Sequence, residues 1–164
     1  MQAVTGVGGT TSAAPEARFI TIGGDTMRLH AERGNVVLLY FWAPWCVTCR
    51  RDLPDIQAVH AARASVGLTV VGLSTDRRVA AVTAEYARSR GVTFPVAMAV
   101  DAHTRPYHLV GIPTTVLIDR HGRVRQILRG PVARVALMRA VDRLLAEHAG
   151  AVGVGRMSVP NDSA

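Results

Sequence analysis

Short runs of hydrophobic residues along this chain predict a series of β-strands. The run at 35–41 (NVVLLYF) is almost continuously apolar, which is typical of a strand covered on both faces. Two pairs of shorter runs flank Gly23-Gly24-Asp25 and Asp119-Arg120-His121-Gly122, and each pair predicts a β-hairpin. The predicted strands are 19–22, 27–29, 35–41, 69–73, 94–98, 114–118 and 124–128.

Three segments are predicted to be helical, at 46–64, at 77–90 and from Pro131 onward. Asp76 is the expected N-cap of the second helix and Gly91 its end, and Pro131 is the expected first residue of the third. The faces expected to be buried consist of Val79, Val82 and Tyr86 in the second helix and of Leu137, Val141, Leu144 and Leu145 in the third.

The order of these elements is β-β-β-α-β-α-β-β-β-α. Strands that first alternate with helices and then end in a hairpin predict an α/β fold, in which a mixed β-sheet carries helices on both faces. The first two strands add an N-terminal β-hairpin. We expect a single domain at 17–149, because the chain has no internal repeat and a domain has roughly 100–200 residues.

The two ends of the chain differ in composition from the middle. Residues 1–16 are rich in Gly, Thr, Ala and Ser and are expected to form a flexible leader, and residues 150–164 a disordered tail. Ser12-Ala13-Ala14 resembles a cleavage site, but the basic and apolar segments of a signal peptide do not precede it. The chain as given therefore predicts a cytoplasmic location, unless its true start is missing.

Composition and charge argue against several classes of protein. Hydrophobic residues make up 49%, which excludes a wholly disordered chain, and no apolar run approaches the ~20 residues of a membrane-spanning helix. All 19 basic residues are arginines and the net charge is +7, but the arginines are dispersed and only 5% of residues are aromatic. We therefore expect no nucleic-acid partner, and we expect a monomer.

Cys46 and Cys49 are the only cysteines and form a C-x-x-C motif. Two cysteines cannot build a disulfide scaffold, and a closed zinc site would need two further ligands. His103 and His108 are the nearest pair of histidines, but they lack the helical i, i+4 spacing. No metal site is predicted, and the histidines are interpreted as surface or capping residues.

The C-x-x-C motif lies where the first long strand ends and the first helix begins. The N–H groups and partial positive charge of a helix N-terminus stabilise a thiolate, so the pKa of Cys46 should lie below the ~8.5 of a free thiol, with a further effect from Arg50. Cys49 lies one turn on, within disulfide reach, and shares a buried face with Leu53 and Ile56. We expect Cys46 to be the exposed nucleophile and Cys49 the buried resolving thiol.

Three stretches of the sequence resemble the thioredoxin superfamily and, within it, the redoxin-like (AhpC/TSA-like) thiol-disulfide oxidoreductases TlpA and ResA. They are FWAPWCVTCRRDLP at 41–54, GIPTT at 111–115 and VLIDRHGRV at 116–124, and the resemblance extends over 17–149. It implies a thioredoxin-like mixed sheet and a cis-proline beside the C-x-x-C, which Pro113 matches.

The resemblance also implies where a substrate binds. The backbone of Ile112, before the cis-proline, would pair with an extended substrate segment, strand to strand. Trp42 and Trp45 are interpreted as packing residues and as the wall of the site rather than as chemical groups.

The sequence departs from the family pattern at three places. The dipeptide between the cysteines is Val47-Thr48, without the proline that is common there, and Tyr40 stands where thioredoxins keep a buried acid. Asp52 stands where relatives of TlpA and ResA often carry a Glu. Asp52 is either a proton acceptor for Cys49 or a solvated residue paired with an arginine. Pro54 is expected to kink the helix.

These observations predict a thiol-disulfide oxidoreductase that reduces protein disulfides. Cys46 would form a mixed disulfide that Cys49 resolves, and an external thiol reductant would restore the dithiol. No cofactor is predicted, because the sequence has no Gly-rich nucleotide-binding motif. One alternative is a peroxiredoxin-like thiol peroxidase, which Trp45 directly before Cys46 and the second cysteine disfavour. The other is a redox-silent binding module of the same fold.

We expect the pair to be reducing rather than oxidising. The helix N-terminus and Arg50 favour the Cys46 thiolate, whereas an anionic Asp52 would disfavour it, and Val47 and Thr48 add no charge. The redox potential should then lie nearer to about −270 mV than to about −120 mV, the values of thioredoxin and DsbA. The resemblance suggests an extracytoplasmic reductive role if the true N-terminus is missing.

Overall fold

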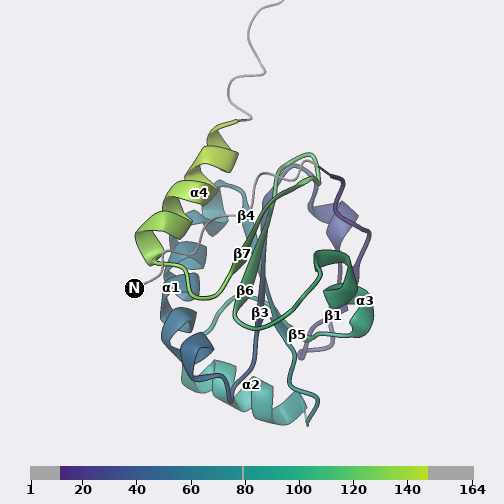
Figure 1. The fold of residues 1–164 in the computed structure, drawn as a ribbon, viewed down its shortest axis with the longest axis vertical. Helices are drawn as coiled ribbons and strands as arrows, with labels where there is room; N and C mark the ends of the chain where they lie inside the picture. Colours follow the sequence, from purple (N-terminus) through teal and green to yellow (C-terminus); the bar gives the residue numbers. More distant parts are fainter. Residues whose placement is uncertain (1–11, 79, 148–164) are drawn as a thin grey trace, which may run out of the picture.

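A five-stranded sheet separates two layers of helices and loops (Figure 1). The structure, a computed structural model, describes residues 12–78 and 80–147. The sheet has the order β5-β4-β3-β6-β7. Its strands are β3 (Val36–Trp42), β4 (Leu68–Ser74), β5 (Val96–Met98), β6 (Thr114–Ile118) and β7 (Val124–Arg129). β3, β4 and β5 run parallel, whereas β6 is antiparallel to both of its neighbours, so the predicted mixed sheet is confirmed.

The remaining elements cover this sheet. The N-terminal hairpin consists of β1 (Arg18–Ile20) and β2 (Thr26–Arg28), as predicted. The helices are α1 (Val47–Arg63), α2 (Ala80–Ser89), α3 (Asp101–Thr104) and α4 (Arg134–Ala146). Short 3₁₀ turns lie at Leu29–Glu32, Ala64–Val66 and Arg105–Tyr107.

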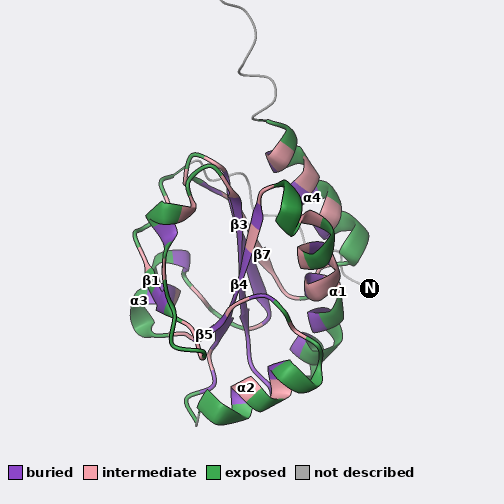
Figure 2. Ribbon diagram, turned by 180° about the vertical axis from the view of Figure 1, so that it is seen from behind, coloured by how far each residue is buried: buried purple, intermediate pink, exposed green. Residues whose placement is uncertain are grey.

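Alternate residues of β3 face two separate hydrophobic cores. Leu38, Tyr40 and Trp42 belong to the core that α1 and α4 cover. Val37 and Leu39 belong to the opposite core, which the β1–β2 hairpin and the segment around α3 cover. Every residue of β3 is buried, and Figure 2 shows burial concentrated in the strands. The continuous apolar run in the sequence thus reflects a strand with helices or loops on both faces.

The predicted start of α2 was wrong. The first described helical residue is Ala80, because the carboxylate of Asp76 accepts the N–H of Arg78 at 3.0 Å and pairs with its guanidinium, which fixes a turn ahead of the helix. The predicted apolar face was wrong in part: Tyr86 packs against the core, but Val82 is 46% exposed, and the buried residues of α2 are Thr83 and Ala87. Val79 lies outside the described residues.

Two further differences concern the last third of the chain. α4 begins at Arg134 with Ala133 as N-cap, so Pro131 precedes the helix instead of opening it. Its buried stripe contains Leu137, Val141 and Leu144, as predicted. The short helix α3 was not predicted, because a segment of four residues carries no hydrophobic periodicity.

The described part of the chain begins within the segment interpreted as a leader. Ala13 forms a β-bridge with Arg123, and the N–H of Ala14 donates to the carbonyl of Gly122 at 2.8 Å. Residues 1–11 and the predicted tail at 150–164 lie outside the described residues. Among the helices of the described part, none is long and apolar enough to cross a membrane.

Gly72 on β4 marks a close approach between two aromatic side chains and the backbone. A Cβ at this position would lie 2.8 Å from Cε2 of Phe94 and 3.2 Å from Nε1 of Trp42. We predict that Gly72→Ala lowers the free energy of unfolding by about 1–3 kcal/mol, because both rings are packed in the core and must shift. Urea denaturation monitored by Trp fluorescence measures the change.

Gly111→Ala is the matched control for this prediction. A Cβ at Gly111 would meet nothing within 4 Å, and the residue does not adopt a positive φ. The free energy of unfolding should therefore change by less than about 1 kcal/mol. Equal losses in the two variants would show that the close approach at Gly72 does not limit packing.

Candidate active site

The two cysteines lie at the junction between the central strand β3 and the helix α1. After β3 ends at Trp42, the chain turns so that the N–H of Cys46 donates to the carbonyl of Ala43 at 3.1 Å. Cys46 is the N-cap of α1, and the N–H of Arg50 donates to its carbonyl at 3.0 Å. The predicted placement of the C-x-x-C at a helix N-terminus is therefore confirmed.

Cys46 and Cys49 form a disulfide with a Cα–Cα distance of 5.2 Å. The Sγ of Cys46 also accepts the N–H of Cys49 at 3.2 Å, so the sulfur occupies the position of a capping side chain. Cys46 is 8% exposed and Cys49 is 0% exposed. Cys46 is thus the less buried of the two residues, and a backbone N–H directed at its sulfur is the kind of contact that stabilises a thiolate.

Tyr40 connects the sheet to the second cysteine. Its side chain is fully buried, and its hydroxyl donates to the carbonyl of Cys49 at 3.2 Å. Burial raises the pKa of Tyr40, and the nearby Asp52 raises it further, so the hydroxyl stays protonated and remains a donor. In the sequence, Tyr40 is distinguished only as a residue that replaces an acid. The hydrogen bond could not be foreseen, because it joins a strand to a helix.

Asp52 lies on α1 one turn after Cys49 and is only 6% exposed. Of the two interpretations of Asp52, the solvated one is wrong: none of the ion pairs among residues 12–78 and 80–147 involves it. Burial raises its pKa to about 6, although a hydrogen bond from the backbone of Val132 opposes this shift and the nearby Asp55 reinforces it. Near neutral pH this carboxylate is mostly ionised yet can bind a proton.

Ile112 and Pro113 lie at the same end of the sheet as the cysteines. β3 and β6 pair Phe41 with Thr114, so the residues just before Thr114 lie beside the chain that leaves β3. The Ile112–Pro113 peptide bond is cis, as the resemblance implied. Ile112 packs against the core that contains both cysteines, and its N–H and carbonyl have no hydrogen bond within the described part of the chain.

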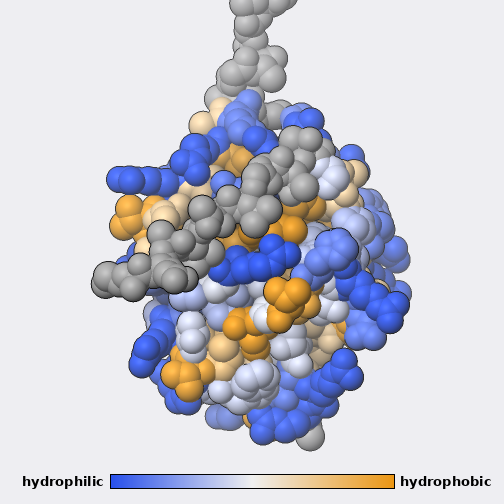
Figure 3. All heavy atoms as spheres, in the orientation of Figure 1, coloured by the Kyte–Doolittle hydropathy of each residue, from blue (hydrophilic) through white to orange (hydrophobic). Residues whose placement is uncertain are grey.

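The two tryptophans of the motif have different environments. Trp42 is completely buried in the core, whereas Trp45, directly before Cys46, is 57% exposed. Val47 and Val110 are also exposed. On the face seen in Figure 3, separate hydrophobic groups lie among hydrophilic residues. The exposed apolar side chains beside Cys46 can contact a substrate, which suits Trp45 to the predicted role of site wall.

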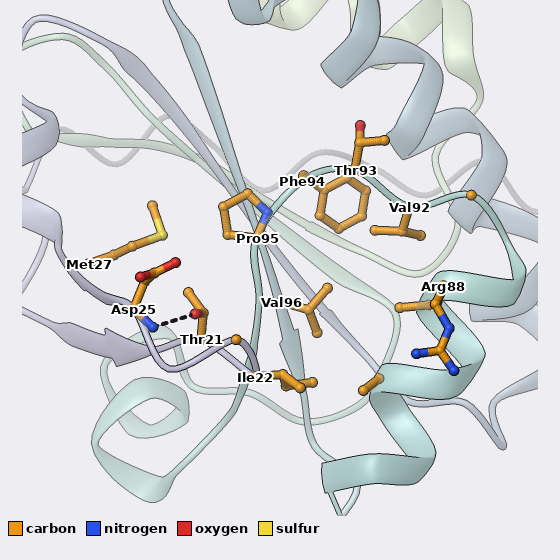
Figure 4. A pocket seen from close by; sticks show the side chains of 14 residues that line it. Thr21, Ile22, Asp25, Met27, Arg88, Val92, Thr93, Phe94, Pro95 and Val96 are labelled. Atoms are coloured by element: carbon orange, nitrogen blue, oxygen red, sulfur yellow. Dashed lines mark hydrogen bonds between the residues drawn. The ribbon is translucent and has the colours of Figure 1, made fainter.

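A separate pocket of about 520 Å³ lies elsewhere in the molecule. Figure 4 shows its lining, which includes Ile22, Met27, Phe94 and Val96. Neither the cysteines nor any other residue predicted to belong to the site lines it. This pocket is therefore distinct from the redox site, which lies at the N-terminus of α1.

A mixed sheet with a C-x-x-C at the end of its central strand and a cis-proline beside it defines the class of thioredoxin-fold dithiol proteins. Residues 10–127 match the model of the AhpC/TSA family, and the chain belongs to that family.

Several characterised proteins are similar to this chain. The thiol-disulfide oxidoreductase ResA of Geobacillus kaustophilus is 28% identical over 134 residues, which are 81% of this chain and 76% of ResA. The sporulation thiol-disulfide oxidoreductase A of Bacillus subtilis is 28% identical over 115 residues, 68% of this chain and 69% of that protein. A thiol:disulfide interchange protein of Chlorobium tepidum has a similar structure, with a TM-score of 0.76, 28% identity, and coverage of 85% of this chain and 99% of its own.

Because the pKa of Asp52 is raised in the folded protein, we expect its contribution to the free energy of unfolding to depend on pH. The folded protein binds the proton of Asp52 more tightly than the unfolded chain, so this group contributes stability that is complete below pH 3.8 and is lost as the pH rises through about 6. Relative to the wild type, Asp52→Asn should therefore gain free energy of unfolding over this range, by up to about 3 kcal/mol. Urea unfolding at a series of pH values measures the difference.

Asp142→Asn is the control, because Arg63 holds the pKa of Asp142 below its ordinary value. Asp142 is then ionised in both the folded and the unfolded state above about pH 5. The difference between Asp142→Asn and the wild type should stay constant from there to neutral pH. A constant difference for Asp52→Asn as well would contradict the raised pKa.

Proposed function

We propose that this chain is a thiol-disulfide oxidoreductase that reduces disulfide bonds in partner proteins. The observation that carries the proposal is the asymmetry of the cysteine pair. Cys46 caps α1, accepts an N–H at its sulfur and is the more exposed of the two, whereas Cys49 is completely buried. The relatives named as thiol-disulfide oxidoreductases support the same activity.

In the first step, the thiolate of reduced Cys46 attacks one sulfur of the substrate disulfide. A bond forms between Cys46 and that sulfur, the substrate S–S bond breaks, and the second substrate sulfur leaves as a thiolate that takes up a proton. The N–H of Cys49 and the N-terminus of α1 favour the attacking anion.

In the second step, Cys49 attacks the sulfur of Cys46 in the mixed disulfide. The substrate leaves as a dithiol, reduced by two electrons, and the Cys46–Cys49 disulfide remains. Cys49 must first lose its proton, and we propose that Asp52 accepts it, since Asp52 is buried one turn along α1 and has a pKa near 6. An external thiol reductant then restores the dithiol.

Substrate binding is proposed to involve the backbone of Ile112. Its free N–H and carbonyl would pair with an extended segment of the substrate, while Trp45 and Pro113 contact the side chains next to the disulfide. We propose that one thioredoxin-like domain at 17–149 carries all of these residues and acts as a monomer. An extracytoplasmic location remains a proposal that follows from the resemblance alone.

The roles of the two cysteines are tested by single substitutions. Cys49→Ser should accumulate a mixed disulfide between Cys46 and the substrate, because the attack that releases the substrate is lost, whereas Cys46→Ser should form none. Non-reducing electrophoresis after incubation with insulin detects the adduct, and limited alkylation of the reduced wild type should label Cys46 first. Insulin reduction in the presence of dithiothreitol tests the activity itself. Peroxide consumption without insulin reduction would instead favour the peroxidase.

The direction of the reaction is tested by the redox potential. We predict a value nearer to about −270 mV than to about −120 mV, because Asp52 opposes the stabilisation of the thiolate by the helix N-terminus. Equilibration with a glutathione buffer, followed by fluorescence of Trp42 and Trp45, measures it. A value more positive than about −180 mV would make the protein an oxidant or an isomerase.

A further inference from the structure

Two arginines contact the same tyrosine ring beside the cysteine site. Nε of Arg50 on α1 donates to the hydroxyl of Tyr86 on α2 at 3.1 Å, and its guanidinium lies 5.7 Å from the centre of the ring. The guanidinium of Arg90, just after α2, lies 5.0 Å from the same centre. The Tyr86 ring in turn packs on Trp42, with 6.0 Å between ring centres. Tyr86 therefore holds two cations against the structure that carries the cysteines.

Neither arginine is neutralised by a carboxylate. Among the described residues, the ion pairs do not include Arg50 or Arg90. The acidic residues of α1 and α2 are engaged elsewhere, since Asp55 pairs with Arg134, Glu85 pairs with Arg88, and Asp52 is buried. The N–H groups of Arg90, and those of Arg50 other than Nε, thus remain available to an anion from outside.

The Tyr86 ring connects Arg90 to Arg50, which lies on α1 near its N-terminus. Arg50 follows Cys46 by one helical turn, and Figure 1 shows α2 beside the first turns of α1. Arg50 and Arg90 are exposed, as is Trp45. A protein whose disulfide reaches Cys46 therefore brings neighbouring side chains close to Arg50, which shares the Tyr86 ring with Arg90.

We propose that Arg50 and Arg90, held by Tyr86, form a docking surface for acidic side chains that flank the disulfide of the substrate protein. This inference rests on the proposed function and adds a substrate class to it. A guanidinium can stack on an aromatic ring and still bind a carboxylate through two parallel N–H groups. Because Tyr86 already restricts both side chains, less conformational entropy is lost when a carboxylate binds. Basic residues near a substrate disulfide would be repelled by the same surface.

The test compares three peptides with the same intramolecular disulfide and with flanking residues that are all Asp, all Asn or all Lys. The full chain is reduced, freed of reductant and mixed with each peptide, and the second-order rate of oxidation is followed by Trp fluorescence. We expect the Asp peptide to react about tenfold faster than the Asn peptide at low salt, the low end of electrostatic rate effects. The Lys peptide should be the slowest.

Substitutions of the arginines distinguish an effect on substrate docking from an effect on the reactivity of the Cys46 thiol. Losing a positive charge also changes the reactivity of Cys46 toward every peptide, so the ratio of Asp to Lys rates is the quantity compared. In the double variant Arg50→Gln/Arg90→Gln this ratio should fall close to one. Arg33→Gln is the matched control, because Arg33 is exposed, forms no ion pair among the described residues and precedes the opposite end of β3. It should keep the wild-type ratio.

A salt series with the wild type gives a second measurement that needs no variant. The ratio of the rate with the Asp peptide to the rate with the Lys peptide should fall as NaCl rises from about 0.01 M to about 1 M. Over this range of salt concentration the electrostatic screening length drops from about 30 Å to about 3 Å. Equal rates for the three peptides, or a preference that survives in the double variant, would overturn the docking surface alone. Failure to oxidise the chain with any of the peptides would instead contradict the proposed reductase.

Discussion

The hydrogen bond from Tyr40 to the carbonyl of Cys49 is the constraint on which the site depends. Tyr40 lies in the central strand, and Cys49 lies in the first turn of α1. This turn is composed of weak helix formers, since Val47 and Thr48 are β-branched, and Pro54 cannot donate to the carbonyl one turn before it. A buried donor from the sheet gives the turn an anchor that the helix itself does not supply, and this anchor does not involve either cysteine sulfur.

Tyr40 also affects which ionisable groups lie on the buried side of the cysteine site. Tyr40 stands where the resemblance to thioredoxins implies a buried acid, and Asp52 is a buried carboxylate on α1 one turn after Cys49. A neutral tyrosine and one acid with a pKa near 6 give the buried side of the site a single group that gains or loses a proton near neutral pH. On the exposed side, the N-terminus of α1 acts on Cys46 with the opposite sign. In the proposed reaction, the helix N-terminus would favour attack by Cys46, and Asp52 would accept the proton of Cys49 from the buried side of the same turn.

The sequence predicted the parts of the fold that depend on local pattern. The run of apolar residues in β3, the start of α1 at the C-x-x-C and the two hairpins are each encoded within a few consecutive residues. The errors arose where contacts between particular side chains and backbone groups determine the structure, which hydrophobic periodicity does not record. Asp76 binds Arg78 instead of capping α2, and α4 starts at Arg134 instead of at Pro131. Asp52 is buried because the segment before α4 covers it, and no pattern within α1 could reveal this.

The sequence also could not show which arginines carry a charge that is available to a partner. In the sequence they are dispersed and alike, and a net charge of +7 says only that the surface is basic. The fold divides them: Arg123 and Arg125 share the buried carboxylate of Asp119, and Arg63 pairs with Asp142. Such pairs stabilise or position the chain and present little charge to a partner. Arg50 and Arg90 are among the arginines that form no ion pair within the described part of the chain, and both contact the ring of Tyr86, which packs on Trp42 just before the redox site. Net charge therefore becomes informative about partners only after the internal ion pairs have been assigned.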